Sequence, residues 1–382
     1  MRFKIIFVFC TVLFVGGAMV LFAADGSVLD KPKMKSLNVG FNGETIKSFY
    51  TVIDARSPRQ RAADKKRGHL AGDVVVFFQG HGQRPTDAYK FTSKLALKSK
   101  SGIVIIPVSD TPYGKDKNWR GDRGKDVILM EVVRYLLYEK GIYVDGYRPV
   151  SDMPAYVNDK DMLKNMSHEG IHTRLSAVGW SHGGILARRF AHTYPEATIG
   201  LAHVCPAGYA QRGVLRLVLG FGWESIHTST LSLKGYAGDV FKAGWGITRG
   251  VTGDFIRAVP SAAIHLQPSK LCRPFRDIKD CTLYCDDTNL PVPDIDNLVV
   301  IFGDRDSCMD VRKQAGISDP HEPSEAEVER FWSRFYPSAV SNRARLTFKV
   351  LPGMHLAPVI YSDIYSSAVL EGLNQPAVSR DQ

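Results

Sequence analysis

The chain has 382 residues, of which 44% are hydrophobic and 23% charged, and its formal net charge is +10. Such a composition is ordinary for a folded soluble protein with one large domain or two smaller ones. The sequence has no internal repeat and no long low-complexity tract, which excludes a solenoid and a disordered linker protein.

Positive charge concentrates in residues 56–67 and 98–125. Neither stretch carries the interleaved aromatic residues or the motifs of a nucleic-acid-binding protein. We therefore expect solvated loops and no nucleic-acid partner, with association with an anionic membrane surface as the alternative.

Residues 1–24 have the organisation of a targeting segment. Arg2 and Lys4 precede an apolar run over residues 5–22, and Ala23 and Ala24 follow it. This order predicts a cleaved secretory signal and an exported protein, periplasmic or secreted. Because the run is also just long enough to span a bilayer, an uncleaved membrane anchor is the main alternative, and a buried N-terminal helix is a third.

Strand and helix patterns alternate through the rest of the chain. The strand-like apolar runs are residues 48–53, 74–78, 103–108, 175–178, 198–204, 298–302 and 345–350. Helical spacing of apolar residues marks 126–140, 184–194, 324–335 and 357–373. The alternation predicts an α/β fold, with a mostly parallel sheet covered by helices on both faces and its ligand site beyond the carboxyl ends of the strands.

Two insertions interrupt this alternation. Residues 141–172 are polar and contain several acids, which indicates an excursion near the surface. Residues 206–296 are rich in glycine and large apolar side chains, which favours a cap with an apolar pocket over the strand ends. Packing of those side chains onto the main domain explains the same composition.

The most informative motif is Gly179-Trp180-Ser181-His182-Gly183, which has the form G-x-S-x-G. Alone, it also fits a glycine-rich turn with an incidental serine. Its position after a buried strand and before a helix favours a nucleophile, because such a turn exposes the serine hydroxyl beside the positive end of a helix.

A serine nucleophile needs a base and an acid that orients the base. His355 lies in a loop after the last strand and before the last helix, so it is the candidate base. The apolar strand 298–302 leads into Asp304 and Asp306, and we prefer Asp306 as the acid because the turn after Gly303 exposes the later carboxylate. Asp310 is a more distant candidate, and a solvated polar turn is the alternative.

Oxyanion donors are expected from backbone N–H groups at two neighbouring strand ends. One is His182, directly after the serine. The other is His81, in the glycine-containing turn that follows the strand 74–78. Substrate contacts are expected from the residues beside these donors, namely Gln79, Gly80, Gly82 and Trp180.

Cysteines cluster late in the chain. Cys272, Cys281, Cys285 and Cys308 lie within 37 residues, and in an oxidising compartment they predict two disulfides with three possible pairings. Cys205 ends an apolar strand and is expected to be a buried thiol. A zinc site at Cys281 and Cys285 is disfavoured, because no second close pair of ligands accompanies them.

In these loops and their order, serine then aspartate then histidine, the chain resembles the α/β-hydrolase superfamily over about residues 45–375. The resemblance implies an eight-stranded, mostly parallel sheet with a core of residues 45–205 and 297–375 and a cap, 206–296, inserted after strand six. The chain departs from the family in two respects. Gln79 stands where many members have histidine, and the first two strands are hard to identify, with residues 56–70 as a candidate for the second strand.

The resemblance implies a serine hydrolase with a Ser181, Asp306 and His355 triad, no metal and no other cofactor. We expect it to cleave a carboxylic ester, small or lipid-like, as an esterase or lipase does. Thioesterase, amidase and acyltransferase activities use the same triad, and a non-catalytic lipid-binding protein could use the same scaffold. The sequence leaves the acyl and alcohol groups and the oligomeric state open.

Overall fold

The computed structural model describes residues 29, 32–80, 88–108, 122–150, 152–153, 155–157, 170–210, 220 and 286–374. Its strands are β1 (Lys35–Phe41), β2 (Glu44–Asp54), β3 (Val74–Phe78), β4 (Ile103–Pro107), β5 (Ile142–Val144), β6 (Ala155–Val157), β7 (Ile171–Thr173), β8 (Leu175–Trp180), β9 (Thr198–Val204), β10 (Asn297–Gly303) and β11 (Arg345–Leu351). Its helices are α2 (Pro58–Arg67), α3 (Tyr89–Lys98), α4 (Asp122–Tyr138), α6 (His182–Thr193), α10 (Val311–Gln314), α11 (Glu325–Phe335), α12 (Pro337–Ser341), α13 (Ala357–Ile360) and α14 (Ser362–Leu373).

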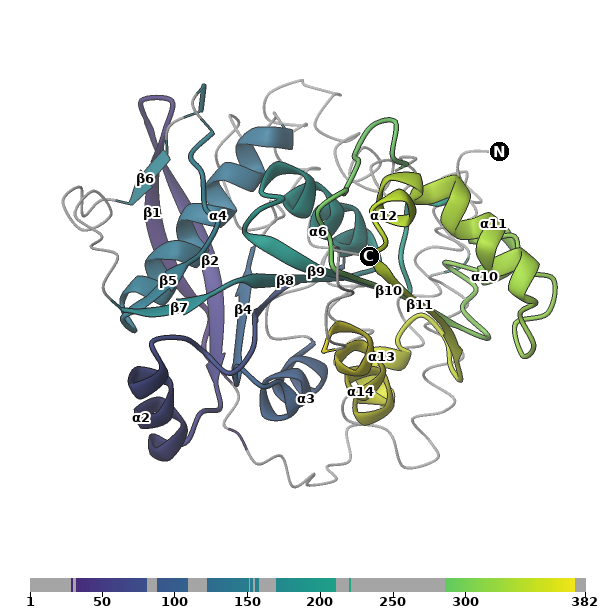
Figure 1. Cartoon of the computed structure of the whole chain (residues 1–382), viewed down its shortest axis with the longest axis horizontal. Coiled ribbons are helices and arrows are strands. Elements are labelled where there is room, and N and C mark those ends of the chain that lie inside the picture. Colours follow the sequence, from purple (N-terminus) through teal and green to yellow (C-terminus); the bar gives the residue numbers. More distant parts are fainter. Residues whose placement is uncertain are drawn as a thin grey trace, which may run out of the picture.

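One large sheet organises the fold, with the strand order β11-β10-β9-β8-β3-β4-β2-β1-β6 (Figure 1). Neighbours from β11 to β4 run parallel, and the pairs β4–β2, β2–β1 and β1–β6 run antiparallel. The predicted eight-stranded, mostly parallel sheet is confirmed. The three-residue strand β6 extends it by a ninth strand at the edge.

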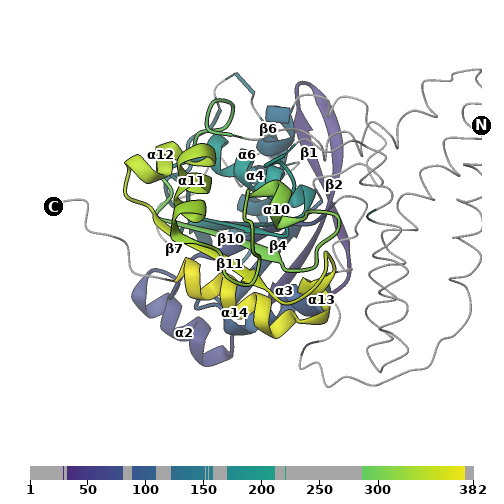
Figure 2. The same cartoon turned by 90° about the vertical axis from the view of Figure 1, so that its right-hand side faces the viewer.

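Helices cover both faces of the sheet. Every residue of β3 and of β10 is buried, as expected for strands that have helices on both sides. One apolar cluster includes side chains of α4, α6 and α11, and a second includes side chains of α3, α13 and α14. The two views show these two groups of helices on opposite sides of the sheet (Figures 1 and 2).

The start of the sheet differs from the sequence prediction. Residues 56–70 contain the helix α2 and no strand of the large sheet. Ser57 and Gln60 form a capping box at its start, and Gly68 ends it in the left-handed region at φ 72°. The strand missed by the prediction is β1, which forms a hairpin with β2 through Asn42 and Gly43, both at positive φ.

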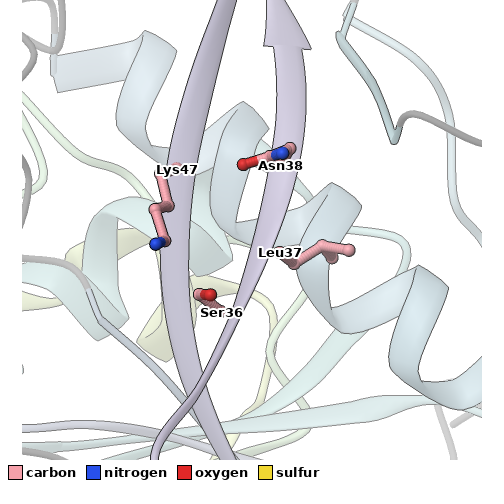
Figure 3. A pocket seen from close by; sticks show the side chains of 4 residues that line it. All are labelled: Ser36, Leu37, Asn38 and Lys47. Atoms are coloured by element: carbon pink, nitrogen blue, oxygen red, sulfur yellow. The ribbon is translucent and has the colours of Figure 1, made fainter.

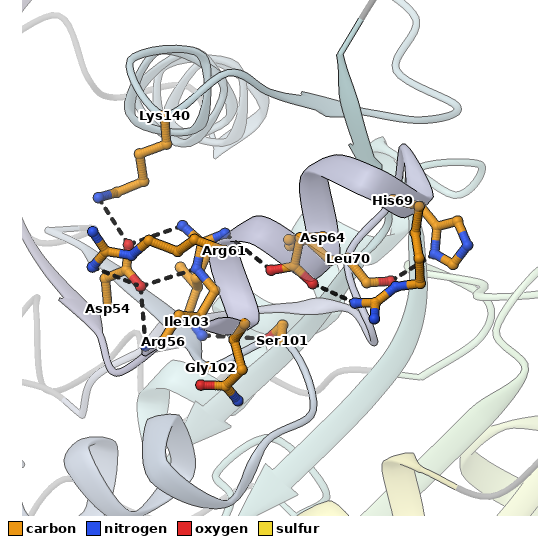
Figure 4. Close-up of polar contacts among 12 residues, drawn as sticks. Asp54, Arg56, Arg61, Asp64, His69, Leu70, Ser101, Gly102, Ile103 and Lys140 are labelled. Carbon is orange, nitrogen blue, oxygen red and sulfur yellow. Dashed lines mark hydrogen bonds and ion pairs between the residues drawn. The ribbon is translucent and has the colours of Figure 1, made fainter. Parts of the chain in front are cut away.

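A polar network holds α2 and the end of α4 to the sheet (Figure 4). Asp54 of β2 accepts hydrogen bonds from Arg56 at 3.0 Å and from Lys140 at 3.1 Å, and Arg56 also donates to Asp64 of α2 at 3.3 Å. Asp54 pairs with Ile103, the first residue of β4. The network therefore lies at the amino ends of the parallel strands, away from the edge where ligands bind in such sheets.

The two insertions are described in part. Within residues 141–172, β5 and β7 form a separate parallel pair and β6 joins the large sheet, so the predicted excursion contributes three short strands. Of residues 206–296, only 206–210, 220 and 286–296 are described, and Tyr209, Val292 and Ile295 among them are buried in the core. The predicted cap and residues 1–24 otherwise lie outside the described residues.

Across the described segments, no helix combines the length and the apolar character that a membrane crossing needs.

Candidate active site

Ser181 stands at the turn between β8 and α6 with φ 57° and ψ −123°. A non-glycine residue at positive φ is strained, and the surrounding structure must hold it there. Three backbone hydrogen bonds do so: Ser181 N–H donates to the Val204 carbonyl at 3.0 Å, and the Ser181 carbonyl accepts from Gly184 at 2.9 Å and from Ala207 at 3.1 Å. This is the strained strand-to-helix turn that the motif predicts.

Two glycines of the motif make this turn sterically possible. A Cβ atom on Gly179 would lie 2.1 Å from the Gly183 carbonyl oxygen, and one on Gly183 would lie 2.0 Å from the Phe78 carbonyl oxygen. The start of α6 is therefore packed directly on the end of β3. This contact brings Gln79 and Gly80, both buried, to the side of the turn.

His355 and Asp306 form a buried pair. The imidazole Nδ1 lies 2.8 Å from Asp306 Oδ2, and the two residues are 2% and 3% exposed. The other carboxylate oxygen, Oδ1, accepts a hydrogen bond of 2.6 Å from the backbone N–H of Met309. Both oxygens of Asp306 are thus engaged, which fixes the orientation of the carboxylate and, through it, of the imidazole.

Asp304 and Asp310 have other partners. The Asp304 carboxylate accepts from the Gly353 backbone N–H at 2.7 Å, which fastens the acid loop to the histidine loop. Asp310 accepts from the Arg312 N–H as the N-cap of α10. The carboxylate that contacts the imidazole of His355 is therefore that of Asp306, the preferred one of the three.

Trp180, the last residue of β8, contacts the loop that carries His355. Its side chain is fully buried, and its indole Nε1 donates a hydrogen bond of 3.1 Å to the backbone carbonyl of His355. The hydrogen bond ties the indole to the histidine loop, and the predicted substrate contact of Trp180 stays a prediction. No sequence pattern predicts this hydrogen bond, since it joins residues 175 positions apart.

Ser181 follows β8, Asp306 follows β10 and His355 follows β11. In the sheet, β10 and β11 are adjacent, and β9 alone separates β10 from β8. The three residues therefore share the carboxyl edge of neighbouring parallel strands. His182 begins α6 and is buried, and Gln79 and Gly80 follow β3. His81 and Gly82 lie outside the described residues, so the second oxyanion donor stays a prediction.

The predicted disulfides stay a prediction, because three of the four clustered cysteines lie outside the described residues. Cys308 is fully buried in the loop after β10, and no disulfide joins two cysteines in the part of the chain that is described. Cys205 is the predicted buried thiol, and Cys272, Cys281 and Cys285 lie outside the described residues.

A polar cluster beneath α6 was missed by the sequence prediction. His203 of β9 lies 2.7 Å from the Tyr209 hydroxyl, which also contacts the Tyr336 hydroxyl. Burial, together with the nearby positive charge of Arg188, lowers the pKa of His203 to about 3, so this histidine is neutral at physiological pH. The only signal in the sequence is a histidine within an apolar strand, which is more typical of the core than of catalysis.

Arg188 fastens the far end of the larger insertion. Its guanidinium is fully buried, donates to Asp287 at 2.8 Å and to the Leu290 carbonyl at 2.9 Å, and lies over the ring of Tyr336. Tyr336 also contacts Tyr209, near the insertion's first residues. Both ends of residues 206–296 are thus attached to the same place on the core.

A surface hollow lies elsewhere, on the ribbon formed by β1 and β2 (Figure 3). It is lined by Ser36, Leu37, Asn38 and Lys47. The strands β3 and β4 separate this ribbon from β8. No predicted site residue belongs to it.

No protein-family model matches the sequence, and no curated protein matches it. Among solved structures, a thermophilic esterase from Thermogutta terrifontis is 13% identical with a TM-score of 0.46, and the match covers 90% of this chain and 98% of that one. A membrane phospholipase A described as a bacterial virulence factor is 13% identical, with a TM-score of 0.48 and coverage of 91% and 88%. A meta-cleavage product hydrolase from Pseudomonas fluorescens is 15% identical, with a TM-score of 0.47 and coverage of 89% and 97%.

Proposed function

We propose that this chain is a serine hydrolase of the α/β-hydrolase type, to which its strand order and loops correspond, and that it cleaves carboxylic esters through an acyl-enzyme on Ser181. The observation that carries the proposal is the buried Asp306–His355 hydrogen bond at the same sheet edge as a serine held at positive φ. A solvated polar turn, the alternative for these acids, would not bury both partners.

The hydrogen bond assigns the protons of the imidazole. A carboxylate only accepts hydrogen bonds, so the contact with Asp306 places the proton on Nδ1 of His355 and leaves the lone pair on Nε2. Nε2 is then the atom that takes the proton of the Ser181 hydroxyl. Asp306 stabilises the imidazolium that results and keeps its own charge.

The steps of the proposed reaction follow from these roles. The Ser181 Oγ attacks the ester carbonyl, and the backbone N–H groups of His182 and His81 stabilise the oxyanion. His355 returns its proton to the departing alcohol, which leaves the acyl group on Ser181. Water, deprotonated by the same imidazole, then releases the acid and restores the serine.

A thioester, an amide or a second acyl acceptor would use the same residues, so these activities are the alternatives to ester hydrolysis. A non-catalytic lipid-binding protein is the rival of another class. Hydrolysis of short p-nitrophenyl esters separates these classes: Ser181→Ala is expected to lower turnover by at least ~10³-fold. Equal turnover by a folded Ser181→Ala variant would remove the assignment, and a series of acyl chain lengths, with a thioester and an amide, would define the substrate.

We further propose that residues 206–296 cap the site and that the protein is exported by residues 1–24. The insertion lies between β9 and β10 in the chain, and both of its ends are attached to the core near Tyr336. This attachment supports the proposed cap. In the N-terminal segment, basic residues precede an apolar run, and this order supports export or anchoring. Fractionation of the expressed chain, with mass measurement of its N-terminus, tests both forms of the export proposal.

A further inference from the structure

Three residues with metal-binding side chains meet beside the proposed base. Asp306 and Cys308 lie in the loop after β10, His355 lies in the loop after β11, and one ligand atom from each falls within 4.8 Å of the others. They are 3%, 0% and 2% exposed. The proposed hydrolysis uses Asp306 and His355 but has no step for the thiol of Cys308.

The backbone holds the two loops together. Asp304 N–H donates to the Leu351 carbonyl at 2.9 Å and Arg305 N–H to the Gly353 carbonyl at 3.1 Å. The Asp304 carboxylate returns a contact by accepting from Gly353 N–H. The backbones of the two loops are therefore fixed relative to each other, and a metal would not have to bring the loops together.

We propose that Asp306, Cys308 and His355 form a binding site for Zn²⁺, and that the bound ion reversibly stops hydrolysis. Sulfur, imidazole nitrogen and carboxylate oxygen are the three ligand types of zinc, and three protein ligands with one open position are a common arrangement. Metal–ligand bonds of about 2.0–2.3 Å place neighbouring ligands of a tetrahedral ion roughly 3.3–3.8 Å apart, so small side-chain rotations bring the three atoms to that spacing.

Charge favours a dication at this buried position. A bare charge in the core is costly, and buried charges are paired or bound to metals. The carboxylate of Asp306 and a thiolate of Cys308 supply two negative charges, which balance those of Zn²⁺, while the imidazole binds neutral. The proton displaced from the thiol passes to solvent.

Inhibition follows from which atom of His355 the metal occupies, and this consequence rests on the proposed function. Coordination through Nε2 removes the lone pair that accepts the serine proton. Coordination through Nδ1 replaces the hydrogen bond with Asp306 and moves the ring proton to Nε2. In both cases the imidazole no longer acts as a base.

Metal binding is tested first in the full chain carrying Ser181→Ala, reduced and freed of metal, so that turnover is not needed. Titration with Co²⁺ as a reporter is expected to give a thiolate-to-cobalt charge-transfer band, and titration with Zn²⁺ to displace it. Adding Cys308→Ser is expected to abolish the band and remove one equivalent of bound Zn²⁺, whereas Cys205→Ser, a matched change at another buried thiol, keeps both. An unchanged band and stoichiometry in the Cys308→Ser protein overturns the inference.

Inhibition is tested in the chain with its serine intact. Zn²⁺ is expected to stop ester hydrolysis and a chelator to restore it, and Cys308→Ser is expected to keep its basal activity and to need roughly 10–100-fold more Zn²⁺. Cys308→Ala replaces it if the serine variant unfolds. Equal sensitivity of the variant and the parent to Zn²⁺ contradicts the inference. If no metal-free protein hydrolyses the ester, the proposed function fails, and the metal titration alone decides whether the site exists.

Discussion

The indole Nε1 of Trp180 donates a hydrogen bond of 3.1 Å to the backbone carbonyl of His355. The bond joins the residue before the proposed nucleophile to the residue proposed as its base. Because both partners are buried, the contact sets how the histidine loop lies relative to the turn after β8.

Trp180→Phe removes this hydrogen bond and keeps an aromatic ring in the core. We expect kcat to fall by roughly 5- to 100-fold, with KM nearly unchanged. The lower value corresponds to the loss of one hydrogen bond of about 1 kcal/mol, and the higher value to a displaced catalytic base. Steady-state kinetics with a p-nitrophenyl ester, beside a thermal melt that shows a folded variant, makes the measurement. A rise in KM at constant kcat would instead support the substrate contact that the sequence predicts.

Asp306→Asn and Asp304→Asn separate the two acids of one loop. Asp306→Asn leaves an amide against Nδ1 and favours the wrong tautomer of His355, so kcat is expected to fall by roughly 10³–10⁴-fold. Asp304→Asn keeps an acceptor for the Gly353 N–H and is expected to cost far less activity. Similar losses of kcat in the two variants would contradict the assignment of Asp306.

Gly183→Ala and Gly184→Ala compare two adjacent glycines of the turn. An added Cβ would lie 2.0 Å from the Phe78 carbonyl oxygen at the first position, but 3.1 Å from the nearest atom, a side-chain carbon of Pro206, at the second. Overpacking costs typically about 1–3 kcal/mol, and we expect Gly183→Ala to reach or exceed that range and Gly184→Ala to stay below it. Urea denaturation measures both, and equal unfolding free energies would count against this packing.

Acid should weaken the network around Asp54. Burial raises the pKa of this carboxyl, but the hydrogen bonds and charges of Arg56 and Lys140 outweigh it and hold the pKa at about 2. Since the unfolded value is about 3.9, the stabilisation is complete above pH ~4 and is lost as the pH falls through 2.

Asp54→Asn is therefore expected to lower the free energy of unfolding by roughly 1–2 kcal/mol at neutral pH, after allowance for partial solvent screening. The difference between parent and variant should shrink as the pH falls below about 4. Urea denaturation across that range checks the sign. A difference that stays constant with pH would show that the charge of Asp54 contributes nothing.

The central sheet was predictable because buried parallel strands are short, apolar and β-branched, as Val74–Phe78 is. β1 was missed because its first half is largely exposed and its sequence, KSLNVGF, has little apolar content. The Asn42–Gly43 pair was the signal that could have revealed the hairpin. For α2, the capping box and Pro58 were readable signs of a helix.

The candidate site was predictable where chemistry follows a strand end, as at Ser181, Asp306 and His355. Contacts between loops far apart in the chain were not. Trp180 and His355, or Cys308 and the Asp306–His355 pair, meet only because four parallel strands bring their carboxyl ends to one edge. Spacing along the sequence does not predict contacts of this kind.

Covalent labelling by a fluorophosphonate probe tests the central claim most directly, because the probe reacts with a serine only when a base activates it. We expect mass spectrometry of the digested protein to locate one probe group on Ser181, with labelling abolished in Ser181→Ala and strongly reduced in His355→Gln. Absence of labelling in the folded wild-type chain, or equal labelling of the Ser181→Ala protein, would contradict the proposed nucleophile.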